Sequence, residues 1–187
     1  MFTDPYAKLC LTTLMASEFE KTIYFDLDTT FTAYFRAGLI RPAKDNRIDI
    51  YVPSEGRLLP LVKDVLESMQ SSSLVIFDSV NSFYNMFNVR EKTLGGLNHL
   101  LSILVMLLVR RGADSGIPVL ATTMFRYRHA GGWVESPASR RLLQNKSAVR
   151  MKVEKKDDDS LSLNIVDHGS IPAGTEILYK NTAVTIA

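Results

Sequence analysis

Two short segments in the middle of the chain are apolar at almost every position and end in polar side chains. The first is Leu-Val-Ile-Phe followed by Asp78, and the second, residues 116–123, ends in Thr122 and Thr123. Continuous apolar runs of this length are typical of strands buried on both faces, and such strands belong to parallel sheets covered by helices. The pair therefore predicts an α/β core with polar groups gathered at the ends of its strands.

The rest of the chain fits this interpretation because helical and extended patterns alternate. Helices are expected at residues 5–15, 29–40, 58–70 and 91–111, and strands at residues 22–27, 49–52, 74–78 and 117–122. Asp4 before Pro5 predicts the start of the first helix, and Gly112 is the expected C-cap of the last. Residues 81–90 and 125–137 are expected to be loops. Alternation in residues 148–155 and 161–166 predicts a β-hairpin at the sheet edge, about residues 148–166.

Length and composition are those of one soluble domain spanning residues 1–187, in which 46% of residues are hydrophobic and 22% charged. Cys10 is the only cysteine, which excludes an intramolecular disulfide and favours residence in the cytoplasm. The N-terminus lacks the pattern of a signal peptide. The longest apolar stretch, residues 100–109, is about half of what a bilayer span requires and is expected to be a core helix.

Nucleotide-binding α/β cores use an acid at the end of such a strand to hold a magnesium-bound water, and Asp78 has that position. These cores also need a Gly-x-x-x-x-Gly-Lys-Ser/Thr loop, whose backbone amides and lysine hold the phosphates. The printed 187 residues contain no such sequence. The sequence therefore predicts the core of a nucleotide-hydrolysing protein that lacks the phosphate-binding loop.

Charge is distributed unevenly, although the whole chain carries only +2. Residues 126–156 hold nine basic side chains and only two acids, Glu135 and Glu154. Such a split is typical of contact with an anionic partner, and a solvated face is the alternative. Aromatic rings interleave with the cations, and such rings stack on bases while cations contact phosphates. The candidate nucleic-acid-binding residues are Arg126, Tyr127, Arg128, Trp133, Arg140 and Lys146.

The order of these motifs resembles the RecA/RadA recombinase superfamily, from about residue 4 to about residue 170. Residues 24–31, Tyr-Phe-Asp-Leu-Asp-Thr-Thr-Phe, resemble the family strand that ends in Asp-x-Glu-x-Thr-Phe, which places Asp28 at the catalytic glutamate. Residues 74–79 resemble the Walker B strand, with Asp78 at the magnesium position. Residues 121–124 resemble the strand that ends in Thr-Asn-Gln, and residues 131–133 and 139–142 the end of the second DNA-binding loop and the strand after it. The resemblance implies a RecA-like three-layer core with a mostly parallel sheet.

The departures from the family pattern lie at the nucleotide positions. Residues 8–10 resemble the helix after the P-loop, so Tyr6 stands where the phosphate-binding lysine belongs, and Ala7 where the magnesium-binding Ser or Thr belongs. Thr123 and Met124 replace the family's Asn and Gln, and a methionine cannot make the hydrogen bonds of an amide. The resemblance therefore implies that hydrolysis is lost and that ATP and magnesium bind weakly or not at all. Asp28, Asp78 and Thr123 are then vestigial site residues, and the family's N-terminal DNA-binding and polymerisation segments are missing.

Three functions are compatible with these features. The first is a non-catalytic paralogue that assembles with a RecA/RadA-like protein or with itself and contacts single-stranded DNA through residues 126–156. The second is a scaffold subunit without nucleic-acid contact, similar to the Elongator accessory ring, with the aromatic residues 83–87 as an interface; these residues could equally be core. The third is an ATPase with a nonstandard nucleotide site built from Asp28, Asp78 and a lysine such as Lys8.

Smaller questions concern single polar residues. Asp26 and Asp28 are either an acid pair with a chemical role, or one is exposed while the other caps the helix that follows. Asp78 is either a metal ligand or a strand-end acid bonded to Ser79 or a nearby loop. His99 lies on an otherwise apolar helix and is expected to be at least partly buried.

Overall fold

The computed structural model describes residues 1–2, 4–41, 46–69, 74–87, 94–128, 132–134, 148–157 and 160–180, with the backbone alone for 126–128 and 132–134. The helices are α1 (Pro5–Glu18), α2 (Thr30–Arg36), α3 (Leu58–Ser68) and α4 (Leu94–Ser115), with short 3-10 turns at Glu55–Arg57 and Ser82–Met86. The strands are β1 (Lys21–Asp26), β2 (Arg47–Tyr51), β3 (Leu74–Asp78), β4 (Val119–Ala121), β5 (Arg126–Arg128), β6 (Gly132–Val134), β7 (Arg150–Asp157), β8 (Ser160–Asp167) and β9 (Glu176–Lys180).

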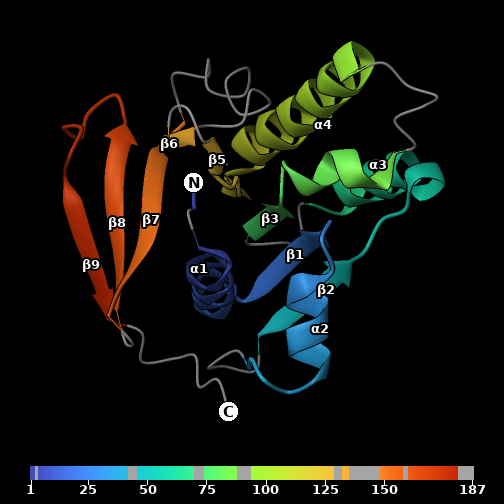
Figure 1. The fold of residues 1–187 in the computed structure, drawn as a ribbon. Coiled ribbons are helices and arrows are strands. Elements are labelled where there is room, and N and C mark those ends of the chain that lie inside the picture. Colours follow the sequence, from blue (N-terminus) through green and yellow to red (C-terminus); the bar gives the residue numbers. More distant parts are fainter. Residues whose placement is uncertain are drawn as a thin grey trace.

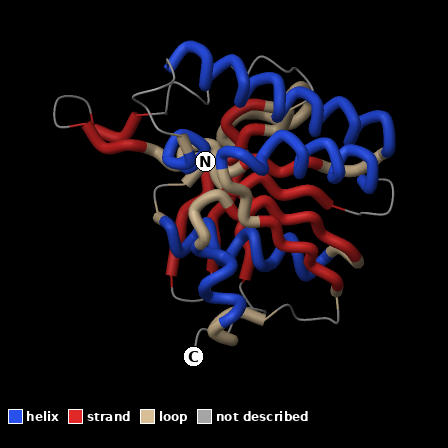
Figure 2. The backbone as a smooth tube through the Cα atoms, turned by 90° about the vertical axis from the view of Figure 1, so that its right-hand side faces the viewer, coloured by secondary structure: helices blue, strands red, loops and turns tan. Residues whose placement is uncertain are grey.

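The centre of the fold is a four-stranded sheet in the order β2-β1-β3-β4, in which every described pair is parallel. Helices lie on both sides of it, α3 and α4 on one face and α1 and α2 on the other (Figures 1 and 2). This confirms the predicted three-layer α/β core. β3 has the bounds that the sequence predicts, because all five of its residues are buried and the apolar run therefore coincides with the strand.

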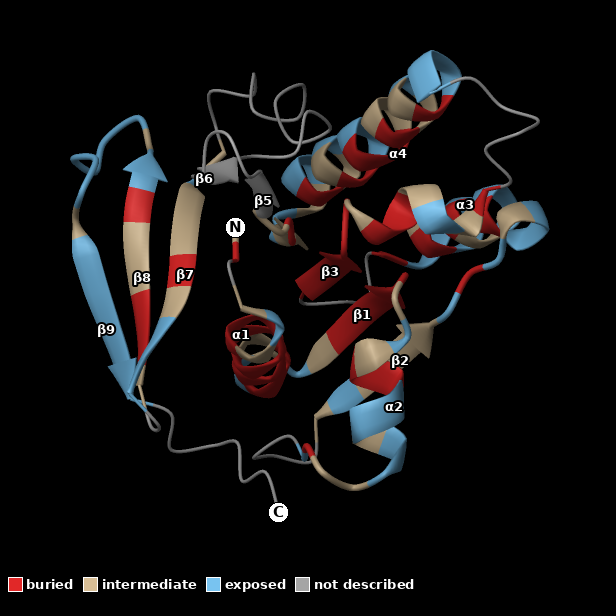
Figure 3. Ribbon diagram, in the orientation of Figure 1, coloured by how far each residue is buried: buried red, intermediate tan, exposed pale blue. Residues whose placement is uncertain are grey.

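Side chains of the central strands alternate between the two helical layers, as the pleat of a sheet requires. Ile23 and Phe25 pack with α3 and α4, whereas Tyr24 packs with α1 and α2. Because both faces are covered, the two inner strands, β1 and β3, are almost entirely buried, whereas the outer strands β2 and β4 are partly exposed (Figure 3). Buried strands of this kind give a rigid edge on which polar groups can be held in place.

A second sheet, β7-β8-β9, is antiparallel and lies on the far side of α1 (Figure 1). α1 therefore packs between two sheets: Leu9 and Ala16 contact the central sheet, and Leu11 and Leu14 contact β7 and β8. The predicted hairpin is confirmed in β7 and β8, but its predicted place at the edge of the central sheet is wrong, because it belongs to a separate sheet on the other side of α1. The sequence prediction omitted β9, which adds a third strand.

Other boundaries differ from the predictions for local reasons. α4 continues past Gly112, and the αL backbone of Gly116, at φ +69°, ends it instead. Gly112 is needed for a different reason, because a Cβ there would lie 2.5 Å from the carbonyl oxygen of Ile117. The predicted loop at 81–90 contains the 3-10 turn 82–86, and the expected irregular segment 125–137 contains the β5–β6 ladder.

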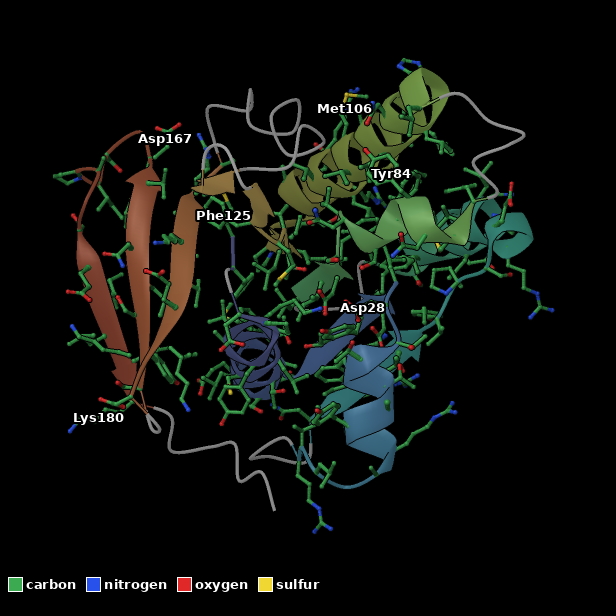
Figure 4. The ribbon with its side chains drawn as sticks, in the orientation of Figure 1. Asp28, Tyr84, Met106, Phe125, Asp167 and Lys180 are labelled. Carbon is green, nitrogen blue, oxygen red and sulfur yellow. The ribbon has the colours of Figure 1, made fainter. Side chains whose placement is uncertain are left out.

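By length and composition alone, α4 is a candidate membrane-spanning helix. One side of it packs into the core, including Leu97, Leu101, Leu104 and Leu108. The other side carries exposed residues such as Met106 (Figure 4). His99 is also on the exposed side, which corrects the expectation that it is buried.

Candidate functional site

Three aspartates meet at the carboxyl ends of the two central strands. Asp26 ends β1 and Asp78 ends β3, and the two are register partners in the parallel ladder. Asp28 follows β1 by two residues (Figure 4). One carboxylate oxygen from each of the three lies within 4.8 Å of the others. The edge expected from the sequence is therefore present, and it is strongly acidic.

A lysine from α1 pairs with two of these three aspartates. The Nζ of Lys8 lies 2.6 Å from Oδ2 of Asp28 and 2.8 Å from Oδ1 of Asp78. The Lys8 residue is only 2% exposed. Burial alone lowers the pKa of Lys8, but the charges and hydrogen bonds of Asp78 and Asp28 outweigh it and raise the pKa above its ordinary value. Lys8 is therefore a buried ammonium ion shared by two carboxylates.

Asp78 is fully engaged by donors from three elements. Besides Lys8, it accepts hydrogen bonds from the hydroxyl of Tyr24 at 2.7 Å and from Oγ1 of Thr122 at 2.5 Å. Burial and the nearby Asp78 raise the pKa of Tyr24 well above its ordinary value, which keeps its hydroxyl a donor. The ring of Tyr24 stacks on Phe31 with centroids 4.0 Å apart, which fixes the direction of that hydroxyl.

The other two aspartates hold the start of α2. Asp28 accepts a hydrogen bond from the backbone N–H of Thr30 at 3.0 Å, and Asp26 accepts one from that of Thr32 at 2.7 Å. Both aspartates thus satisfy amides at the beginning of the helix, where the sequence analysis expected only one to do so. Asp28 is partly exposed and Asp26 is fully buried.

Their charge states differ because their surroundings differ. Burial raises the pKa of Asp28, but the hydrogen bond and charge of Lys8 outweigh it, and the pKa lies below its ordinary value. Burial, together with the charges of Asp28 and Asp78, raises the pKa of Asp26 from 3.8 to about 6. One oxygen of Asp26, Oδ1, has no hydrogen-bond partner among the described residues.

The first turn of α1 is closed to an anion by its own cap. The Asp4 carboxylate accepts hydrogen bonds from the backbone N–H groups of Tyr6 at 2.9 Å and Ala7 at 3.3 Å. Backbone amides in the first turn of a helix can bind a phosphate when no side chain caps them. Here the Asp4 carboxylate already accepts from two of them. Ala7 is fully buried, and the ring of Tyr6 lies 5.0 Å from the ammonium of Lys155 on β7. The positions that the sequence analysis compared with the P-loop lysine and Ser/Thr thus serve packing against the second sheet.

Thr123 and Met124 join the two sheets through their backbone. The backbone N–H of Phe2 donates to the carbonyl of Thr123 at 2.9 Å, and Phe2 forms parallel bridges with Met124 and with Val153 of β7. The backbone N–H of Met124 also donates to Oδ1 of Asn81 at 2.7 Å. Thr123 is nearly buried, so its position serves the junction between the sheets.

The carboxylates of Asp28 and Asp78 are the candidate ligands for a divalent cation at this site. A cation bound by Asp28 and Asp78 needs oxygen ligands that are free to face it. The ammonium of Lys8 already lies between the two carboxylates at hydrogen-bonding distance from each. The described geometry is that of an internal ion pair, and a divalent cation at this position would have to displace the ammonium of Lys8.

Four of the six predicted nucleic-acid-binding residues lie in the β5–β6 ladder, in which Tyr127 is the register partner of Trp133. Arg126 and Arg128 belong to the same strand as Tyr127. Arg140 and Lys146 lie outside the described residues.

Three of the four basic side chains on β7 have acidic neighbours. Lys152 lies 2.7 Å from Glu154, Lys156 lies 3.1 Å from Glu176, and Arg150 lies 4.0 Å from Asp167. These contacts reduce the positive charge that the strand presents. The ammonium of the fourth, Lys155, lies over the ring of Tyr6.

The aromatic segment 83–87 is core. Phe83 and Phe87 are buried and their ring centroids lie 4.9 Å apart, while Tyr84 and Met86 pack against the same cluster. Of the two interpretations of this segment, the structure confirms the core and not the interface, because its large apolar side chains are already covered within the core cluster.

Sequence reasoning singled out Asp28, Asp78 and Lys8, and the structure brings all three together. The sequence prediction assigned no role to Tyr24 or Thr122. Tyr24 carried a usable signal, since a tyrosine inside a buried strand needs a hydrogen-bond partner for its hydroxyl. Thr122 carried a weaker one, as a hydroxyl at the end of the strand next to Asp78.

The chain is similar to a solved structure described as the crystal structure of the RadB recombinase, with a TM-score of 0.69. The two share 16% sequence identity, and the match covers 98% of this chain and 87% of the other. No protein-family model and no curated protein matches the sequence. The chain therefore has a RecA-like fold, as the order of its motifs predicts.

Proposed function

We propose that this chain is a RecA-like protein that does not hydrolyse ATP and acts as an accessory subunit in DNA recombination or repair. In this proposal it works in the cytoplasm, assembles with a RecA/RadA-like protein or with itself, and contacts single-stranded DNA through the region that begins at Arg126. The observation that carries the first part is the position of Lys8. Its ammonium holds Asp28 and Asp78 together at the strand ends where the resemblance places catalysis and magnesium.

Two further sets of contacts support a silent nucleotide site, by which we mean one that neither binds ATP tightly nor hydrolyses it. The carboxylate of Asp4 occupies the first amides of α1, so a phosphate approaching that helix would meet a negative charge. Asp78 is bonded to Tyr24 and Thr122 as well as to Lys8, which leaves it engaged in the protein's own contacts. ATP and magnesium are accordingly proposed to bind weakly or not at all. A nonstandard ATPase that uses Lys8 is disfavoured, because its ammonium is buried against carboxylates.

Support for DNA contact comes from the sequence and backbone of the β5–β6 ladder. Arg126 and Arg128 flank Tyr127 on one strand, and Trp133 is the register partner of Tyr127 on the other. Cations that contact phosphates together with aromatic residues that stack on bases are the components of a site for single strands of any sequence. The recombination or repair role also rests on the likeness to a structure described as a recombinase.

The test is fluorescence anisotropy with labelled single-stranded DNA at low and high salt, each with and without Mg-ATP. We expect binding at low salt, a steep loss of affinity at high salt and no response to ATP. The double variant Arg126→Glu/Arg128→Glu is expected to lose binding. A matched variant with the same charge change on an exposed surface elsewhere, Arg57→Glu/Lys63→Glu, is expected to keep it.

Each part of the proposal has its own contrary result. Absence of binding at low salt would replace the DNA role by a purely structural subunit. Affinity that changes with Mg-ATP, or steady release of phosphate above the protein-free rate, would contradict the silent nucleotide site.

A further inference from the structure

The outer strand of the second sheet is exposed although its centre is apolar. β9 pairs with β8 along one edge, and no described residue pairs with its other edge. All five of its side chains are exposed, including Ile177 at 46%, Leu178 at 56% and Tyr179 at 37%. Open edges of this kind are sites for pairing with another strand unless charge, proline or a bulge blocks them. The only charged residues of β9, Glu176 and Lys180, lie at its two ends.

The direction of the open backbone groups follows from the ladder with β8. Ile165 donates to the carbonyl of Thr175 and accepts from the N–H of Gly174. Antiparallel ladders alternate, so Ile177 and Tyr179 face β8 in the same way. The N–H and C=O groups of Glu176, Leu178 and Lys180 then face the open edge, where three positions are ready to pair with another strand.

The sequence of β9 is complementary to itself in the antiparallel direction. It runs Glu-Ile-Leu-Tyr-Lys. When two such strands are paired about Leu178, each Glu176 faces a Lys180 of the other copy, and each Ile177 faces a Tyr179. Opposite charges and apolar–aromatic pairs directly across a ladder are stabilising. We propose that β9 pairs with β9 of a second copy of this chain, forming one six-stranded antiparallel sheet with a twofold axis at Leu178.

The apolar rows of the existing sheet continue through this junction. Ile177 is the register partner of Leu163, and Tyr179 is the register partner of Leu161. Leu161 and Leu163 belong to the cluster that β8 forms with α1. Pairing about Leu178 extends each row from Leu163 through Ile177 to Tyr179 and Leu161 of the second copy. Ile177 and Tyr179 thereby gain apolar neighbours on both sides, while Leu178, whose partner on β8 is Ser162, gains Leu178 of the second copy.

Self-complementarity is the reason to choose a second copy over a different protein. A strand of another protein could use the open edge, but nothing in β9 would require it to carry Lys opposite Glu176 and Glu opposite Lys180. The proposal does not depend on the nucleotide site or on DNA binding. Its test measures mass, so it fails or succeeds separately from the proposed function.

The first measurement is the mass of the full chain in solution by sedimentation equilibrium over a wide range of protein concentration. We expect a reversible monomer–dimer equilibrium. Hydrogen exchange is expected to show that the amide of Leu178, which faces the open edge, becomes more protected as the dimer forms. A chain that remains monomeric at the highest concentration overturns the proposal.

Charge variants then test the register. Glu176→Lys places two lysines opposite each other at both ends of the junction, and Lys180→Glu places two glutamates there. Each variant alone is expected to dimerise about tenfold more weakly than the unaltered chain, because like charges face each other directly. An equal mixture of the two variants restores both pairs of opposite charge and is expected to regain the affinity.

The matched control for Lys180→Glu is Lys63→Glu on α3, which makes the same charge change on an exposed residue far from β9 in sequence. It is expected to dimerise like the unaltered chain. Circular dichroism and melting temperature show whether each variant is folded. If the mixture of Glu176→Lys with Lys180→Glu associates no better than either variant alone, the proposed register is wrong even where a dimer exists.

Discussion

Two lysine–carboxylate clusters in this molecule have similar contact distances and opposite surroundings. In the central site, Lys8 lies 2.6 and 2.8 Å from Asp28 and Asp78, and the side chains of Lys8 and Asp78 are 3% and 1% exposed. In the second sheet, Lys156 lies 3.1 Å from Glu176, and these side chains are 49% and 41% exposed. Water screens the second pair and barely reaches the first. Burial, more than contact distance, therefore decides which pair the fold depends on.

The most direct test of this comparison is to remove the lysine from each cluster. Lys8→Met should lower the free energy of unfolding by about 3–5 kcal/mol, because it leaves two carboxylates in the interior without their counter-ion. The matched change Lys156→Met should have little or no effect. Chemical denaturation of both variants, compared with the unaltered chain, measures the difference.

The Lys8 variant also offers a test of what the lysine replaces. Once the ammonium is removed in Lys8→Ala, Oδ2 of Asp28 loses its hydrogen-bond donor and Asp78 loses its counter-ion. Millimolar Mg²⁺ or Mn²⁺ should then raise the melting temperature of the variant, because a cation can replace the missing positive charge. The same ions should leave the melting temperature of the unaltered chain unchanged.

The first comparison also has a contrary outcome: equal free energies of unfolding for Lys8→Met and Lys156→Met would show that burial does not separate the two clusters.

A second test concerns Asp26, whose pKa is raised to about 6 mainly by burial. The folded pKa exceeds the unfolded value of 3.8, so protonated Asp26 stabilises the fold at low pH, and this contribution is lost as pH rises through about 6. Asp26→Asn is neutral throughout and keeps an oxygen for the N–H of Thr32. Relative to this variant, the unaltered chain should lose on the order of 2 kcal/mol between about pH 4 and pH 7.

Denaturant titrations of both proteins across that pH range measure the effect. The comparison with an exposed acid is Glu176→Gln, for which no loss of stability with rising pH is expected, since Lys156 and Ser162 lower the pKa of Glu176. A difference between Asp26→Asn and the unaltered chain that stays constant with pH would contradict the assignment of a raised pKa to Asp26.

A third test removes a single hydroxyl, with an expected effect of about the same size. Tyr24→Phe removes the donor that lies 2.7 Å from Asp78 and keeps the ring stacked on Phe31. The loss should be about 1.5–3 kcal/mol, the range for a hydrogen bond to a charged group. Tyr34→Phe, on an exposed side chain, should be neutral. If both substitutions cost the same in thermal or chemical unfolding, the hydroxyl of Tyr24 is not part of the buried network.

The parts of the fold that sequence predicts well are those whose burial is uniform. β3 has the predicted bounds because every one of its residues is buried, and α3 begins at the predicted residue because its apolar residues repeat with helical spacing. β9 was missed because all five of its residues are exposed, so it has no alternation of buried and exposed side chains. The end of α4 was misplaced because Gly112 looks like a helix cap, whereas its lack of a side chain serves the close approach of Ile117.

The candidate site shows the same division. Asp78 was found from its place at a strand end, Asp28 from the family resemblance of residues 24–31, and Lys8 from its distance along the chain to the expected P-loop position. Burial at the ends of β1 and β3 was needed to show that Lys8 neutralises both aspartates. Tyr24 and Thr122 joined the site only once the strands were placed side by side, because their hydrogen bonds to Asp78 span 54 and 44 residues.

The sequence by itself determined the α/β class, the parallel core strands and the acids at their ends, because these follow from local patterns of apolar and polar residues. Only the tertiary structure decided what those acids do. The positions of α1 and β3 bring Lys8 between Asp28 and Asp78, and the layers around them exclude water from that contact. The electrostatic energy of a charge depends on its three-dimensional surroundings, and a linear pattern does not contain them.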